Sequence, residues 1–242
     1  MTIVAEKRRV PGGRQKKAPK SLANSVLTDQ QRRTVHMAAS ILLDYPKPDR
    51  RVHFDEVAKA VTGLPIEIAE EFSTFLNAAA AMSQGEIESH YTVIFDQKRK
   101  CCPYLTYYST GDTRRRGMAL VGFIEAYRAA GWEALDGELP DYLPMVLEFS
   151  ARSDSPIAGQ LLTSYREGIE VLRTALESFN SPYWHVVSAV CRSFGQIDDE
   201  TRERYLRLVN EGPPTEMVGV TTFLGALAPY TPAGATSEGV RA

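Results

Sequence analysis

The sequence predicts an all-α protein, with a single helical-bundle domain over residues 25–210 and flexible N- and C-terminal tails. Apolar residues recur every three or four positions in one segment after another, and Pro or Gly marks the ends of these segments. Alternating apolar and polar residues, bounded by turn residues as in a strand, are found nowhere. At 242 residues, 43% of them apolar, the chain can bury a core of its own.

In the first half of the domain the sequence predicts four helices, and a residue at or near the end of each one marks its boundary. The first begins at Thr28 or Asp29 and ends before Pro46. Pro65 suits the first turn of the third helix, because the N–H that it lacks has no partner there. Gly85 separates the third helix from the fourth. The second helix covers residues 55–62, and the fourth carries the apolar stripe Ile87, Tyr91, Ile94 and Phe95.

In the second half of the domain the sequence predicts five more helices. Two of these helices lead to specific expectations. The helix over 113–130 contains an uncharged segment, 118–124, which predicts a central position in the bundle. Ser155 and Pro156 start a long helix that runs to Phe179, with apolar residues three or four positions apart throughout. The others are expected over residues 140–150, 181–195 and 199–209.

Charge divides the chain into a basic arm and an acidic body. Residues 1–20 hold seven Lys and Arg against one Glu, a net charge of +6, so the rest carries −8 of the total of −2. We treat 1–24 as a basic flexible arm and 211–242 as a flexible C-terminal tail. The acidic body gives no basis for binding nucleic acid, which needs a basic face.

Cysteine usage and apolar runs bear on the compartment. Three cysteines, two of them adjacent, form no convincing disulfide framework. No apolar run reaches the roughly 18–20 residues of a membrane span, and the first residues lack the order of a signal peptide. These observations predict a cytoplasmic protein without a direct membrane span.

Catalytic motifs are absent from the sequence. Neither of the common glycine-rich phosphate loops occurs, and there is no zinc motif or nucleophile elbow. Cys101 and Cys102 fit a semi-buried pair better than a metal or redox site. Glu167, Glu170 and Glu177 fit a solvated face with Arg partners better than a di-iron site. The sequence therefore favours a binding protein over an enzyme, with no metal site.

Two stretches carry a resemblance to a known family. The first is Tyr91–Asp96, followed by Tyr104–Tyr108 and the run Gly111-Asp112-Thr113-Arg114-Arg115-Arg116-Gly117, and the second is 138–149. Together they resemble the delta subunit of respiratory nitrate reductase, the NarJ-type assembly chaperones of molybdenum enzymes. The resemblance covers roughly residues 28–200.

The resemblance implies a cytoplasmic chaperone that is not itself an enzyme and holds no stably bound cofactor. Such a protein binds the nitrate reductase alpha subunit, chiefly through its N-terminal segment, while the molybdenum cofactor is inserted and before the complex docks on its membrane subunit. Cofactor-delivery proteins are further candidate partners. The alternatives are a sister chaperone for another molybdenum oxidoreductase, a helical enzyme acting on an anionic substrate, and a protein that binds nucleic acid through the basic tail.

Ten residues of these stretches are candidates for client binding, and most also have a structural interpretation. Asp112 and Asp141 could instead cap the helices that follow them, and Tyr91 and Phe95 could be core residues. Arg116 is expected to anchor the bundle. The tyrosines after Pro103 predict a loop of the kind favoured at interfaces. The full set is Tyr91, Phe95, Asp96, Tyr104, Tyr107, Tyr108, Asp112, Arg114, Arg116 and Asp141.

Overall fold

A computed structural model describes residues 27–134 and 137–194, and regular structure within these ranges is entirely helical. The prediction of an all-α fold is therefore confirmed. Both tails and the helix predicted over 199–209 lie outside the described residues. The helices are α1 (Asp29–Leu43), α2 (Arg50–Ala60), α3 (Ile66–Ala80), α4 (Gln84–Tyr91), α5 (Leu105–Thr110), α6 (Arg115–Ala129), α7 (Leu143–Arg152), α8 (Pro156–Ser164), α9 (Arg166–Ser178) and α10 (Tyr183–Ser193).

Three short elements complete the described part of the chain. A single 3₁₀ turn, η1 (Val61–Gly63), follows α2, and another, η3 (Arg99–Cys101), precedes α5. Between them, the π-helix η2 (Thr92–Asp96) extends α4. This π-helix carries part of the first family-like stretch.

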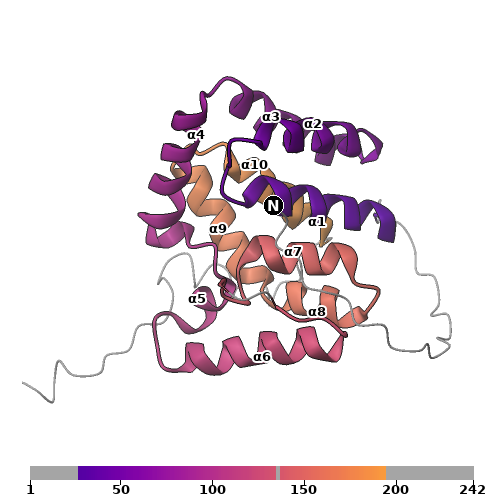
Figure 1. The fold of residues 1–242 in the computed structure, drawn as a ribbon, viewed down its shortest axis with the longest axis vertical. Helices are drawn as coiled ribbons and strands as arrows, with labels where there is room; N and C mark the ends of the chain where they lie inside the picture. Colours follow the sequence, from indigo (N-terminus) through magenta and orange to yellow (C-terminus); the bar gives the residue numbers. More distant parts are fainter. Residues whose placement is uncertain (1–26, 135–136, 195–242) are drawn as a thin grey trace, which may run out of the picture.

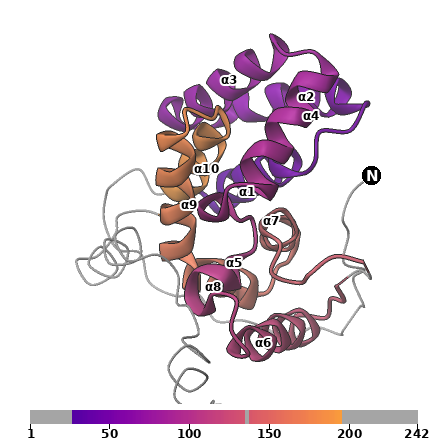
Figure 2. The same ribbon diagram turned by 90° about the vertical axis from the view of Figure 1, so that its left-hand side faces the viewer.

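The helices form two ends and a middle (Figure 1). Helices α2, α3 and α4 make up one end, and α5, α6 and α8 the other. Between them α1 packs along α7, and α10 packs against α1, α3 and α9. The view in Figure 2 shows α9 and α10 beside α1, with α6 at the far end of the domain. One apolar core runs through the molecule, and its largest fully buried side chains include Phe72, Phe75, Tyr127, Phe149 and Tyr183.

Side-chain caps fix several helix starts, as expected from the sequence. Thr28 and Gln31 form a capping box at α1, with N···O distances of 3.0 and 3.1 Å. The Ser155 hydroxyl accepts the Ile157 N–H at 3.3 Å and starts α8. These caps satisfy N–H groups that have no partner inside the helix. The predicted starts of the first helix and of the helix after Ser155 are confirmed.

The long helix predicted over 156–179 is wrong, because the chain divides there into α8 and α9 at Tyr165. Helix α8 packs on α6 and α7, whereas α9 packs on α10 and α5. A Cβ at Gly168 would lie 2.8 Å from the Cβ of Tyr108, so only glycine allows α9 to approach α5 so closely. The apolar spacing continues through the division, which is why periodicity alone misses it.

The central position predicted for segment 118–124 is also wrong. Helix α6 lies at the edge of the domain and leaves Met118 76% and Val121 47% exposed (Figure 1). Only Phe123 and Tyr127 on this helix are buried. Lack of charge therefore marks an exposed apolar face here, not a core position.

Other boundaries differ from the predicted ones by a few residues. The helix expected to begin at 55 begins at Arg50, and the helix expected at 140 begins at Leu143. Gly85 does not separate the third helix from the fourth, because it lies inside α4, which Ser83 caps. The loop predicted around the tyrosines is α5, with Tyr104 as the residue before it. That helix has no sequence signal of its own, because its first turn is capped from a distant part of the chain.

Arg50 joins three elements at one end of the bundle. Although charged, it is only 4% exposed. Its guanidinium donates to the carbonyl oxygens of Ala79 and Met82 at 3.3 and 2.9 Å, and to Gln84 Oε1 at 2.9 Å. The Ala79 carbonyl lies in the last turn of α3 and also accepts the Met82 N–H at 3.2 Å, and the Met82 carbonyl lies in the turn after α3. Arg50 thus connects α2 to the α3–α4 turn.

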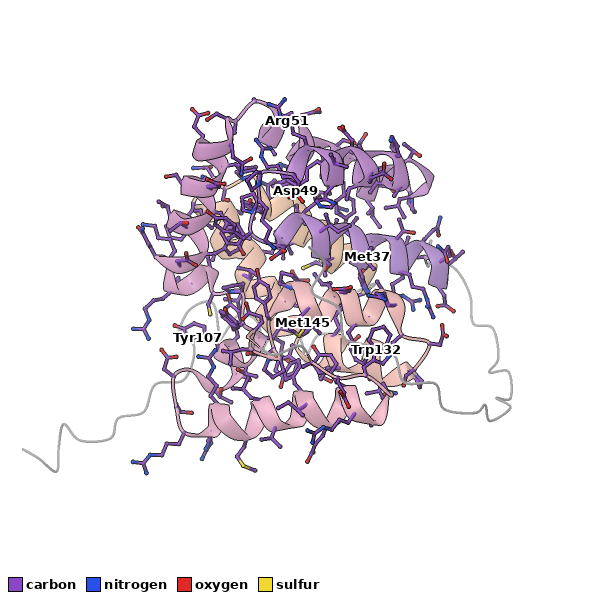
Figure 3. The ribbon with its side chains drawn as sticks, viewed as in Figure 1. Met37, Asp49, Arg51, Tyr107, Trp132 and Met145 are labelled. Atoms are coloured by element: carbon purple, nitrogen blue, oxygen red, sulfur yellow. The ribbon has the colours of Figure 1, made fainter. Side chains whose placement is uncertain are left out.

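We expect Arg50→Met to lower the free energy of unfolding by about 2–4 kcal/mol, because buried carbonyl groups lose charged donors while the side-chain length is kept. Arg51→Met is the matched control. Arg51 is exposed on the same helix (Figure 3), and its replacement should change stability by about 0.5 kcal/mol or less. Urea unfolding followed by circular dichroism measures both, and equal losses would contradict this role of Arg50.

Candidate functional site

Two loops cross beside the candidate residues and pair through their backbones. Leu105 N–H donates to the carbonyl oxygen of Asp141 at 3.0 Å, and Leu143 N–H donates to that of Pro103 at 2.8 Å. The pair forms an isolated antiparallel bridge between Tyr104 and Tyr142. We call this crossing of 103–105 with 141–143 the Tyr104–Tyr142 bridge. It sets the starts of α5 and α7 side by side.

The carboxylate of Asp141 caps α5 from this bridge. Its Oδ2 accepts the Thr106 N–H at 3.0 Å and the Thr106 hydroxyl at 2.6 Å. Asp141 is fully buried, and Thr106 is the second residue of α5. The sequence offered Asp141 as a cap for the helix that follows it, but α7 has no side-chain cap. The cap serves a helix 35 residues earlier in the chain.

Tyr91 and Phe95 lie in the core below the bridge. The Tyr91 hydroxyl donates to the carbonyl oxygen of Leu43 at 3.1 Å and lies 2.9 Å from the Tyr142 hydroxyl. Phe95 packs on Tyr91, with ring centroids 4.6 Å apart. Burial raises the pKa of Tyr91 well above its ordinary value. These contacts connect η2 and the end of α1 to the bridge.

The other tyrosines hold the η3–α5 segment in place. Tyr108 is only 2% exposed, and its hydroxyl donates to the carbonyl oxygens of Lys100 and Cys102 at 3.1 and 2.8 Å. Tyr107, also buried, accepts a hydrogen bond from Arg99 Nε at 3.3 Å. Figure 3 shows Tyr107 at one end of α6 and Trp132 at the other. Tyr104 is half-buried and donates to Glu138 Oε1 at 3.1 Å.

Asp112 does not cap the helix after it, so that prediction is wrong. Helix α6 begins at Arg115 without a side-chain cap. The Asp112 carboxylate instead lies between Arg99 and Arg116, at 3.3 and 3.4 Å. Arg116 is 23% exposed, and its guanidinium lies 5.7 Å from the centre of the Tyr104 ring.

The structure thus brings most of the ten candidates into one cluster around the Tyr104–Tyr142 bridge. Tyr91, Phe95, Tyr107, Tyr108 and Asp141 are buried within it. Asp96, Asp112 and Arg114 are exposed, and Tyr104 and Arg116 are partly so. Client contact by any of the ten stays a prediction. The contacts seen here explain the family-like stretches as supports of the fold.

A large groove lies away from this cluster, and sequence reasoning missed it. It has a volume of about 1310 Å³ and is lined by α1, the first turn of α3, the end of α7, α8, the end of α10 and the turns before α3 and α8. Its walls mix apolar, hydroxyl and charged side chains, among them Leu27, Arg33, Ile68, Asp154, Gln160 and Phe194. The α8 residues that line the groove, among them Gly159 and Thr163, are small or polar and belong to no motif in the sequence.

His36 lies at the base of this groove and joins three helices. Its Nδ1 lies 3.0 Å from the Ser150 hydroxyl and its Nε2 lies 2.9 Å from the Ser193 hydroxyl. Ser193 donates its own proton to the Val190 carbonyl, so it accepts from Nε2–H and leaves Nδ1 to accept from Ser150. Burial, with a smaller effect of Arg32, lowers the pKa of His36 to about 3. The ring is therefore neutral.

The other titratable groups that the sequence singled out are structural. Cys101, Cys102 and Cys191 are free thiols, and burial raises the pKa of Cys101 to about 12. Glu170 pairs with Arg173 at 3.2 Å, but it is only 5% exposed, so the expectation of a solvated face is wrong for this residue. Within the described ranges, no three His, Cys, Asp or Glu side chains gather as metal ligands would. No helix there is long and apolar enough to cross a membrane.

The fold, the buried cluster and the groove define an all-helical domain with an open, peptide-sized surface groove. The family model for the nitrate reductase delta subunit matches residues 62–189, and the chain belongs to that family. The resemblance stated from the sequence is therefore confirmed.

Three curated relatives illustrate the match. The chain is 35% identical over 159 residues to the nitrate reductase-like protein NarX of Mycobacterium tuberculosis, covering 66% of this chain but 24% of that protein. It is 30% identical over 172 residues to the probable nitrate reductase molybdenum cofactor assembly chaperone NarJ of Bacillus subtilis, covering 69% of this chain and 92% of the relative. It is 29% identical over 147 residues to the nitrate reductase molybdenum cofactor assembly chaperone NarJ of Escherichia coli K12, covering 60% of this chain and 62% of the relative.

We expect Asp141→Ala to lower the free energy of unfolding by about 2–4 kcal/mol, because α5 loses its cap and the buried Thr106 hydroxyl loses its acceptor. Asp112→Ala should cost about 0.5 kcal/mol or less, since its ion pairs are exposed. Chemical denaturation of the two variants gives the comparison. A larger loss for Asp112→Ala would restore it as the helix cap and contradict the present assignment.

We expect stability to fall as the pH drops below 6.5. The unfolded imidazole of His36 takes up a proton near pH 6.5, whereas the folded one resists protonation down to about pH 3. This difference removes up to about 1.4 kcal/mol per pH unit between these values. His36→Asn should flatten the slope, because the variant has no imidazole to protonate at this position. Unfolding free energies at pH 7, 6 and 5 decide whether the slope belongs to His36.

Proposed function

We propose that this chain is an assembly chaperone for a nitrate reductase and catalyses no reaction of its own. It binds the N-terminal segment of the catalytic alpha subunit and assists insertion of the molybdenum cofactor before the complex docks at the membrane. Membership of the delta subunit family supports this proposal, as do the names of the Bacillus and Escherichia relatives. The cofactor belongs to the client and is not held stably by the chaperone.

The large groove is the proposed binding site for the client segment. Small-molecule pockets generally measure about 300–1,000 Å³. At about 1310 Å³ this groove is larger, and it is open along α8. Its lining combines apolar side chains such as Leu27, Ile68 and Phe194 with hydroxyl and charged groups. Such a surface suits the apolar face of an amphipathic helical segment, whose polar face stays in water.

Charge supports the expected approach of the client. The chain outside the basic arm carries a net charge of −8, which favours a client segment with basic residues and speeds its approach at low salt. In this proposal the chaperone meets its client in the cytoplasm, and cofactor-delivery proteins are further partners. The basic arm takes no part in client binding, and the chaperone binds no nucleic acid.

We expect Gly159→Trp to weaken binding of a peptide that copies the first 15–30 or so residues of the alpha subunit by at least about tenfold, a loss of about 1.4 kcal/mol. Gly159 lies in α8 on the groove wall, and a Cβ at this position would have no neighbouring atom within 4 Å. The introduced indole therefore fills the groove without disturbing the core. Isothermal titration calorimetry with wild-type and variant chains measures the change.

Gly85→Trp is the matched control, since Gly85 is also helical with open space around it but lies outside the groove. Its binding should equal that of the wild type. Wild-type affinity in Gly159→Trp, combined with lost binding in an Asp112 or Arg114 variant, would move the client to the bridge cluster. If the wild type binds neither the peptide nor the full alpha subunit, the proposed function itself fails.

A further inference from the structure

Helix α6 presents a face that nothing in the described chain covers. Its buried side is held by Phe123 and Tyr127, whose rings pack on Tyr165 and Phe149 at centroid distances of 4.9 and 4.7 Å. The opposite side is exposed at residues spaced three, four, three and four positions apart. This spacing is that of a helix–helix seam. The exposed residues are Arg115, Met118, Gly122, Glu125 and Ala129.

The composition of this face is unusual for a solvent-facing helix. Met118 is 76% exposed, and the neighbouring Val121 is 47% exposed. Gly117 and Gly122 have open space where a Cβ would stand, so no packing within the domain requires glycine. Each glycine inside a helix costs about 1 kcal/mol relative to alanine. An exposed methionine beside an open glycine provides a knob and a matching hollow.

We propose that α6 pairs antiparallel with α6 of a second copy of this chain. In an antiparallel pair centred on residue 120, residues whose numbers sum to 240 face one another. Met118 of each copy then fits over Gly122 of the other. Arg115 of each copy faces Glu125 of the other, so the same two contacts form twice, as a two-fold interface requires. Within the described chain, neither Arg115 nor Glu125 forms an ion pair.

The size of the surface sets the expected strength. A single pair of short helices buries less than the roughly 1,600 Å² of a standard interface, which is the range of transient complexes. Arg114 and Arg128 fall at the rim of the seam, where water and salt screen them. We therefore expect a weak, concentration-dependent dimer. The α6 face does not line the groove, so both copies keep it available.

Charge reversal tests the pairing directly, with the full chain studied by sedimentation velocity from about 10 µM to about 1 mM, the range in which weak interfaces populate. Arg115→Glu places two acidic residues on each seam, and Glu125→Arg places two basic ones. Each variant alone should dimerise at least about tenfold more weakly than the wild type. An equimolar mixture of the two should restore dimers, because every Glu then faces an Arg.

Three outcomes would overturn the proposal: a wild-type chain that stays monomeric throughout, single variants that dimerise like the wild type, or a mixture that stays monomeric. Thermal melts check folding, and since both positions are exposed, the melting temperatures should match the wild type. Met118→Asp should also give a monomer. If the wild type is monomeric and Met118→Asp abolishes binding of the alpha-subunit peptide, the exposed face of α6 binds the client and not a second copy.

Discussion

The crossing of two loops at the Tyr104–Tyr142 bridge determines how the rest of the domain is arranged. Two backbone hydrogen bonds join Pro103–Leu105 to Asp141–Leu143, and a buried carboxylate is shared with Thr106. Only Oδ2 of the buried Asp141 carboxylate has hydrogen-bond partners, and both belong to Thr106, so a shift of α5 would leave the whole group without a partner. Because α5 is fixed there, Tyr108 can approach Gly168, and that contact accompanies the division between α8 and α9.

Local chemistry explains which features could be predicted from the sequence. Thr28 and Ser155 cap their own helices, so these starts could be predicted from neighbouring residues alone. Helix α5 could not, because its cap comes from Asp141 in another part of the chain. The edge position of α6 was missed for a related reason. An uncharged helical segment has the same sequence pattern whether it packs against the core of its own domain or against another molecule.

The candidate site was predicted in part. The sequence singled out residues that do gather in one cluster, and it allowed Tyr91 and Phe95 as core residues. It expected the tyrosines after Pro103 in a loop of the kind favoured at interfaces, whereas Tyr107 and Tyr108 are buried and two hydrogen bonds hold the Tyr108 hydroxyl. A buried tyrosine and an interface tyrosine have the same sequence signature, since both need an apolar ring environment and a partner for the hydroxyl. The groove had no signature, because its walls come from α1, α8 and α10, which are far apart in the chain.

The position of α1 has a consequence for synthesis on the ribosome. This helix, complete at Leu43, packs along α7 and α10, and α10 ends only at Ser193. The N-terminal helices therefore have no finished core to join until the chain has been made as far as α10. A nascent chain shorter than this exposes the apolar side of α1. The segment 62–189 matched by the family model omits α1 altogether, and as an isolated fragment it would leave the facing sides of α7 and α10 uncovered.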